Sequence, residues 1–144
     1  MVTVLVSLLT LVVGAYLGHF FTKRRISDAN QKEASAEVSR LLRATWLWQT
    51  HWPGEYADGL SSHDIEDVEA RRIDDAIRKL RERSLRDHLK AFLSDLENLG
   101  WLPSRTPESG VEPMPEERGE WFAEKDSLKE VYAALQDRLA KYHH

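Results

Sequence analysis

The feature that most constrains this chain is an N-terminal stretch of 22 residues without a single Asp, Glu, Lys or Arg. Val2 to Thr22 reads VTVLVSLLTLVVGAYLGHFFT. As a helix rising about 1.5 Å per residue, it spans roughly 30 Å, the thickness of the bilayer hydrocarbon core. A helix satisfies its own backbone hydrogen bonds in lipid, where water cannot. We therefore predict a transmembrane anchor over residues 1–22.

A cleaved signal peptide is the alternative interpretation of this segment. Signal peptides begin with a positive region and end at a small-residue cleavage site. The segment has no basic side chain at its start, and no clear site of that kind precedes the basic run. The pattern therefore favours an uncleaved anchor.

The orientation follows from Lys23, Arg24 and Arg25, which come directly after the apolar segment. Such clusters stay on the cytoplasmic side, where anionic lipid attracts them. We expect a single-pass protein of the cell inner membrane, with its N-terminus outside and its remaining residues in the cytoplasm. These three side chains are then predicted to contact the membrane surface.

Small side chains recur every four residues within the predicted span, at Thr10, Gly14, Gly18 and Thr22. This spacing places them on one helix face, where two backbones can approach closely. The stripe predicts self-association of the span, most simply as a homodimer. The alternative is ordinary composition, because glycine is common in membrane helices.

The remaining residues argue against several classes of protein. All 24 acidic and 20 basic residues follow the apolar segment and give a net charge of −4, which disfavours a nucleic-acid binder. The absence of cysteine excludes disulfides, thiolate zinc sites and a cysteine nucleophile. The chain has no Gly-rich phosphate loop, nucleophile elbow or HExxH motif. We therefore expect no enzyme, no catalytic residues and no cofactor.

Residues 26–49 lack Gly and Pro, and their apolar side chains recur at helical spacing. Trp52-Pro53-Gly54 is a strong helix stop. Either the membrane helix continues into this one, or a new helix starts near Ser27, Asp28 or Asn30. The predicted stripe is Ala34, Val38, Leu41, Thr45, Trp48 and Trp52.

A second helical region covers residues 64–99, with Ser61-Ser62-His63-Asp64 as its start and Gly100 as its end. The pattern leaves open whether it is one helix or two that break near Ser84. The apolar spacing slips by one residue at Ile73. Beyond Ser84 the stripe is regular: Leu85, Leu89, Phe92, Leu93, Leu96 and Leu99.

Residues 103–119 contain four of the five prolines and predict a Pro-rich linker or surface strap. Residues 120–144 then predict an amphipathic helix with a capping box at Ser127 and Glu130. This helix should pack on a helical cytoplasmic domain formed by residues 23–102. No segment alternates with period two, so the fold class is all-α: one N-terminal transmembrane helix, then a small three- or four-helix bundle.

Two local clusters suggest sites and also have simpler explanations. His51, Glu55, Asp58, His63 and Asp64 carry metal-ligand chemistry, but no two have the spacing of a recognised site, and helix capping accounts for such acids. We expect no metal.

The second cluster is aromatic. Trp48 and Trp52 share one helix face, and Trp46 lies about 200° from Trp48. Core packing explains most of the three, whereas Trp46 and Trp52 are candidates for a partner surface.

Charge is unevenly distributed along the cytoplasmic part. Residues 71–90 carry eight basic and four acidic side chains, 8 − 4 = +4, and residues 91–125 carry three basic and eight acidic ones, 3 − 8 = −5. The basic stretch could pair within the molecule, face the anionic inner leaflet, or be an ordinary solvated helix face.

Two functions agree with these features. The first is a membrane-anchored interaction or scaffold module that holds an unknown protein partner at the cytoplasmic face of the inner membrane. The second is a membrane-acting effector, resembling toxin or phage-defence proteins in architecture only, whose span oligomerises when the cytoplasmic domain is triggered.

Overall fold

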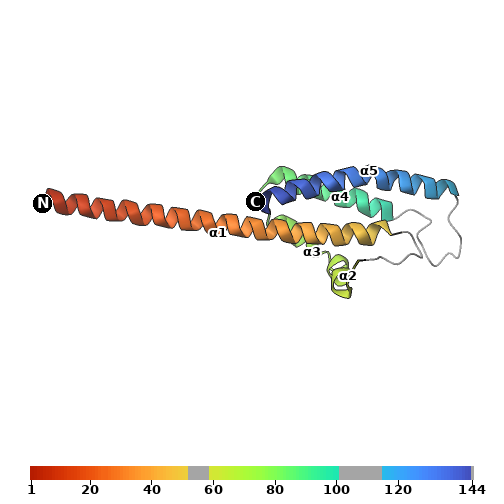
Figure 1. Ribbon diagram of the computed structural model, residues 1–144, viewed down its shortest axis with the longest axis horizontal. Helices are drawn as coiled ribbons and strands as arrows, with labels where there is room; N and C mark the ends of the chain where they lie inside the picture. Colours follow the sequence, from red (N-terminus) through yellow and green to blue (C-terminus); the bar gives the residue numbers. More distant parts are fainter. Residues whose placement is uncertain (52–58, 101–114, 144) are drawn as a thin grey trace.

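The computed structural model describes residues 1–51, 59–100 and 115–143 (Figure 1). None of these residues forms a strand, which confirms the all-α prediction for the part of the chain described. The elements are α1 (Val2–Thr50), α2 (Ser62–Glu69), α3 (Arg72–Arg78), α4 (Arg83–Gly100), α5 (Pro115–Ala140) and the short 3-10 helix η3 (Lys141–His143).

Helix α1 is a single uninterrupted helix of 49 residues, about 74 Å long. Of the two alternatives left open by the sequence, the continuous helix is therefore the one observed. Its first half projects away from the rest of the chain, and residues 1–26 are all exposed (Figure 1). Its second half forms one wall of a helical bundle. One helix thus joins the apolar segment to the folded domain without a loop between them.

The long helices α4 and α5 pack against each other and against the second half of α1. Helix α4 begins at the end of the bundle nearest the apolar segment, which we call the proximal end (Figure 1). It runs to the opposite, distal end, and α5 returns, so the C-terminus lies at the proximal end. Helices α2 and α3 also pack against α1.

The hydrophobic core lies between α1, α3, α4 and α5. On α1 it follows the predicted stripe at Ala34, Val38 and Leu41, whereas Thr45 and Trp48 of that stripe are only partly buried. On α4 the stripe is confirmed almost completely, because only Leu93 is partly exposed. Trp121 of α5 is fully buried, whereas neighbouring Phe122 is 38% exposed. The largest fully buried side chains are Trp121, Phe92, Leu41, Leu42, Ile77, Leu85, Leu89, Leu96, Leu99, Leu139 and Val38.

The region predicted as one helix or two is in fact three. The first break falls after α2, where Arg71 adopts a left-handed backbone conformation with φ of 52°. The second, at residues 79–82 between α3 and α4, lies near Ser84, where the sequence places a possible break. Ile73 is buried on α3, so the slip in its spacing marks the change of helix axis between α2 and α3.

Helix α5 begins earlier than predicted. It starts at Pro115, so the last part of the predicted strap, residues 115–119, is helical, and Ser127 lies in the helix interior rather than at a cap. Proline suits this first position because the missing N–H would have no helical partner there. The rest of the strap, residues 103–114, lies outside the described residues.

Candidate functional site

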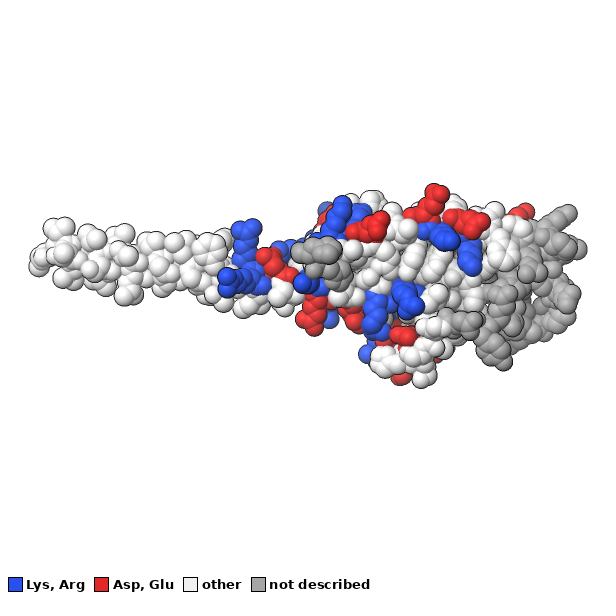
Figure 2. Space-filling model, in the orientation of Figure 1, with Lys and Arg blue, Asp and Glu red and all other residues white. Residues whose placement is uncertain are grey.

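The apolar segment of α1 is long and apolar enough to cross a membrane. None of it is buried inside the chain, so it is not a core helix of the bundle. Lys23, Arg24 and Arg25 lie exposed where the segment meets the domain (Figure 2).

The small-residue stripe lies on the exposed surface of this segment. A Cβ atom added at Gly14 or Gly18 would meet nothing within 4 Å. The hydroxyls of Thr10 and Thr22 donate to the carbonyls of Val6 and Gly18, both at 2.8 Å. The hydroxyl donors of both threonines are thus used within the helix. No other part of the described chain covers the stripe.

Two polar residues of α1, Gln31 and Ser35, bind the other helices at the proximal end of the bundle. The Gln31 side chain donates to the carbonyl of Lys79 and accepts from the N–H of Arg81, both at 2.8 Å. Four residues on, the Ser35 hydroxyl donates to the carbonyl of Leu139 at 2.7 Å, and Ser35 is fully buried. The α3–α4 turn and the end of α5 are therefore fixed to α1 through backbone atoms.

A second cluster ties α4 to the C-terminal end. Glu82 accepts from the Tyr142 hydroxyl at 2.6 Å and from the Arg138 guanidinium at 2.7 Å. These bonds hold the pKa of Glu82 below its ordinary value, and the bond from Tyr142 raises the pKa of that phenol. Arg138 also contacts His88 Nδ1 at 2.7 Å. The proximal end is thus closed by hydrogen bonds between segments far apart in sequence.

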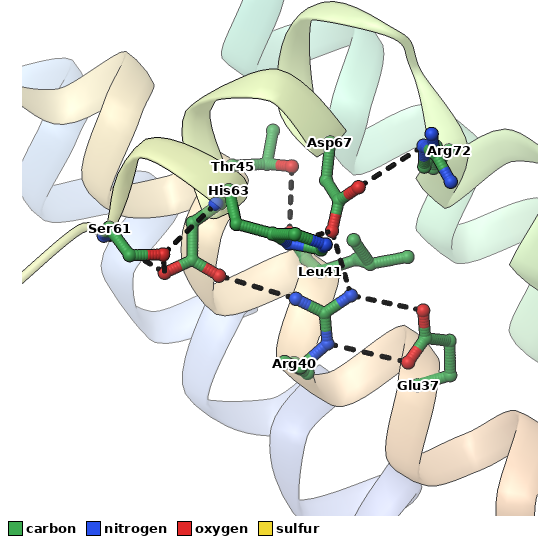
Figure 3. A network of polar contacts seen from close by, with 9 residues as sticks. Glu37, Arg40, Leu41, Thr45, Ser61, His63, Asp67 and Arg72 are labelled. Carbon is green, nitrogen blue, oxygen red and sulfur yellow. Dashed lines mark hydrogen bonds and ion pairs between the residues drawn. The ribbon is translucent and has the colours of Figure 1, made fainter.

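A network of charged side chains joins α2 to the middle of α1 (Figure 3). Its centre is Asp67, a carboxylate only 3% exposed. Arg40 of α1 lies 3.0 Å from it, Arg72 of α3 lies 3.1 Å from it, and His63 of α2 lies 3.1 Å from it. Two arginines thus compensate the buried charge, as a buried carboxylate requires.

Arg40 also contacts two further carboxylates. Glu37 lies 3.1 Å away on α1 and Asp64 3.2 Å away on α2. The hydrogen bonds to Glu37 and then to Asp67 raise the pKa of the Arg40 guanidinium, so it stays charged. One cation therefore bridges the two helices at this point.

The predicted helix start at residues 61–64 is confirmed as a capping box. The Ser61 hydroxyl accepts from the N–H of Asp64 at 3.1 Å, and the Asp64 carboxylate accepts from the N–H of Ser61 at 3.0 Å. The hydrogen bonds from Ser61 lower the pKa of Asp64. Asp64 thus caps α2 and binds Arg40 at once.

Helix α2 contributes no apolar side chain to the core. Its one buried residue is Asp67, while Ile65 and Val68 are only partly buried and stand outside the core cluster. The contact between α2 and α1 is therefore mainly ionic. This distinguishes α2 from the other helices, each of which inserts apolar residues into the core.

A groove of about 850 Å³ runs along α1 at the proximal end. One wall belongs to α1 and the other to the end of α3. The groove ends near the charged network at Arg40. It is lined by Ser27, Gln31, Ala34 and Arg40 of α1 and by Ala76 and Lys79 of α3, among others.

The structure corrects the prediction that Trp46 belongs to a partner surface. Trp46 is 9% exposed, and its indole stacks on Tyr132 at 4.9 Å and on Phe92 at 6.2 Å between ring centroids. The reason is that the buried face near the end of α1 follows Leu42, Trp46 and Thr50 and is rotated away from the predicted stripe. Trp52 lies outside the described residues.

The acidic and histidine cluster around the first loop is only partly described. Glu55 and Asp58 lie outside the described residues, and His63 contacts Asp67 of its own helix. Within the described ranges no three His, Asp or Glu side chains are grouped to hold a metal ion.

Comparisons with models of protein families, with curated proteins and with solved structures find no match to this chain.

Proposed function

We propose that the protein is a membrane-anchored helical interaction module, displayed at the cytoplasmic face of the inner membrane. The observation that carries the proposal is the continuity of α1, whose first half is an exposed apolar segment and whose second half is the central wall of the bundle. Insertion of the first half into the membrane would fix the distance of the domain from the membrane surface and its rotation about the axis of α1. A rigidly placed domain suits a docking platform, because the orientation of the bound partner is set in advance.

The anchor and its topology are tested with fusions to the full chain. A reporter active only in the cytoplasm, placed after His144, should be active, and one active only outside should not. Replacing Lys23, Arg24 and Arg25 by Gln should weaken this preference, because the positive cluster sets it. The reversed pattern, or release of the protein by an alkaline wash of membranes, contradicts the anchor.

The interaction role is tested by affinity capture of the full chain from solubilised membranes. The matched control is a tagged segment of residues 1–27, which keeps the anchor and lacks the bundle. The proposal expects a protein that is enriched by the full chain and not by the control. Equal recovery by both baits contradicts a docking role for the bundle.

A second candidate function is a membrane-acting effector whose span oligomerises. The observation that favours it is the uncovered small-residue face at Gly14 and Gly18. If that face drives assembly, Gly14→Ile or Gly18→Ile should abolish self-association of residues 1–27 in a membrane, and Val12→Ile should not. Growth arrest on overexpression should then depend on the same glycines. Equal association of all three variants counts against this function.

A further inference from the structure

We infer that the proximal end of the bundle is a second membrane-binding surface, formed by Lys79, Arg81, Arg83 and Lys141, and that it binds the anionic head groups of phospholipids. This inference rests on the proposed function, because it requires the apolar segment of α1 to lie in the bilayer. It extends the membrane contact beyond Lys23, Arg24 and Arg25 to residues brought there by the fold.

The fold places these cations close to the membrane. Gln31 holds the α3–α4 turn, and it lies on α1 about 13 Å beyond Thr22. The head-group region extends roughly 5–8 Å from the hydrocarbon core. Long Lys and Arg side chains on this turn therefore lie within reach of the head groups, or within about one Debye length of them.

The cations are available for lipid. The Arg81 side chain is 57% exposed and that of Arg83 is 88% exposed. Their acidic neighbours are Asp28 at 3.7 Å and Asp87 at 3.9 Å, long contacts of a kind that contributes little in water. Another acidic neighbour, Glu82, is already bound by Arg138 and Tyr142.

Part of the charge asymmetry of the sequence becomes an asymmetry along the bundle. In the basic stretch, residues 71–90, Arg71 and Arg72 pair with Glu97 and Asp67, whereas Lys79, Arg81 and Arg83 lie at the proximal end, at the α3–α4 turn and the start of α4. The described part of the acidic stretch lies in the second half of α4 and the first part of α5, toward the distal end, with Asp95, Glu97, Glu120 and Glu124. The positive end therefore faces the anchor. An anionic leaflet on that side attracts it, and the acidic end points away.

The surface is also preorganised. Gln31 binds backbone atoms of residues 79 and 81, and Ser35 binds the backbone of Leu139 next to η3. The backbone that carries the cationic side chains is thus held by hydrogen bonds from α1. Replacing the cationic side chains leaves these hydrogen bonds intact. Substitution at Lys79 and Arg81 therefore tests charge rather than folding.

The experiment uses the full chain in nanodiscs of mixed anionic and zwitterionic phospholipid. A fluorophore is attached at Ser84→Cys, an exposed position next to the turn in a chain with no native cysteine. In one preparation the anionic lipid carries a head-group quencher, and in the other the zwitterionic lipid does. The ratio of quenching measures the local preference for anionic lipid.

The wild-type ratio should exceed one and fall toward one as salt is added. K79Q/R81Q should lower the preference several-fold, since each cation near the surface contributes up to about a fivefold factor at low salt. The matched control K90Q/K129Q removes two exposed cations elsewhere on α4 and α5, and it should leave the ratio unchanged.

An equal ratio in wild type and K79Q/R81Q overturns the inference, because Lys23, Arg24 and Arg25 would then account for all the selectivity. An equal loss in K90Q/K129Q also overturns it, since net charge alone would be responsible. Failure of the wild-type chain to enter nanodiscs contradicts the anchor itself. That result is distinct from an inserted protein that shows no lipid preference.

Discussion

The two sides of α1 are packed by different physical means. On one side, α4 and α5 bury aromatic and aliphatic side chains around Trp46. On the other, α2 is attached mainly through Arg40 and the carboxylates of Asp64 and Asp67. Apolar burial is non-directional and insensitive to salt, whereas ion pairs with exposed partners weaken as salt is added. We therefore expect α2 to detach from α1 before the side formed by α4 and α5 unfolds.

The largest expected effect comes from charge placed in the apolar side. Leu89→Asp or Leu96→Asp should unfold the bundle, because each leucine is fully buried and an unpaired buried carboxylate costs several kcal/mol, comparable to the stability of a small domain. Ala91→Asp, at an exposed position of the same helix, is the control. Thermal unfolding of the full chain in detergent, followed by circular dichroism, provides the measurement. Unchanged melting of both leucine variants contradicts the core described above.

A smaller loss is expected when an aromatic ring is removed from the same side. Trp46→Ala should destabilise the bundle by about 3–5 kcal/mol, because it leaves a cavity between Phe92 and Tyr132. Trp48→Ala should cost less, since Trp48 is only partly buried. Denaturant unfolding of both variants gives the two values. Equal losses at the two positions would show that Trp46 is not central to the packing.

The ionic side predicts a local effect instead of a global one. Asp67→Ala should cost about 1–2 kcal/mol, because Arg40 and Arg72 are exposed enough to be rehydrated once the carboxylate is gone. Hydrogen exchange should rise in α2 and change little in α4 and α5. Asp67→Asn, which keeps the shape and removes the charge, separates the two contributions. Faster exchange throughout α4 would mean that the two sides of α1 are one cooperative unit.

The smallest effect is expected from acid. Asp64 and Glu82 have pKa values lowered by their hydrogen bonds in the folded state. The stability they contribute is therefore present above their ordinary pKa values, near 4, and is lost as pH falls through the lower folded values. In an acid titration, Asp64→Asn and Glu82→Gln should each reduce the fall in the free energy of unfolding as pH is lowered. An unchanged fall in both variants would assign the acid sensitivity to other carboxylates.

The parts of the fold that the sequence predicts are those with long-range periodicity. The stripe from Leu85 to Leu99 and the capping box at Ser61 follow from spacing and local chemistry alone. The break at Arg71 could not be located, because a left-handed conformation at a residue other than glycine leaves no composition signal. Only the slip in spacing at Ile73 pointed to it.

The polar contacts between helices cannot be predicted from the sequence for a related reason. Gln31 and Ser35 are spaced like any helix face, and their partners lie about 50 and 100 residues away. Nothing in the sequence singles out Asp67, because only the fold brings Arg40 and Arg72 to it. Trp46 is a candidate for either the core or a partner surface in the sequence, because the sequence does not show how many helices cover α1.

The continuity of α1 has a geometric consequence for changes in chain length between Ile26 and Gln31. Each inserted residue would turn the bundle by about 100° around the helix axis and move it about 1.5 Å outward. Seven inserted residues would restore the facing to within about 20° while moving the bundle about 10 Å farther from the apolar segment. The rotation of the bundle about the α1 axis and its distance from the apolar segment can therefore be changed separately in this protein.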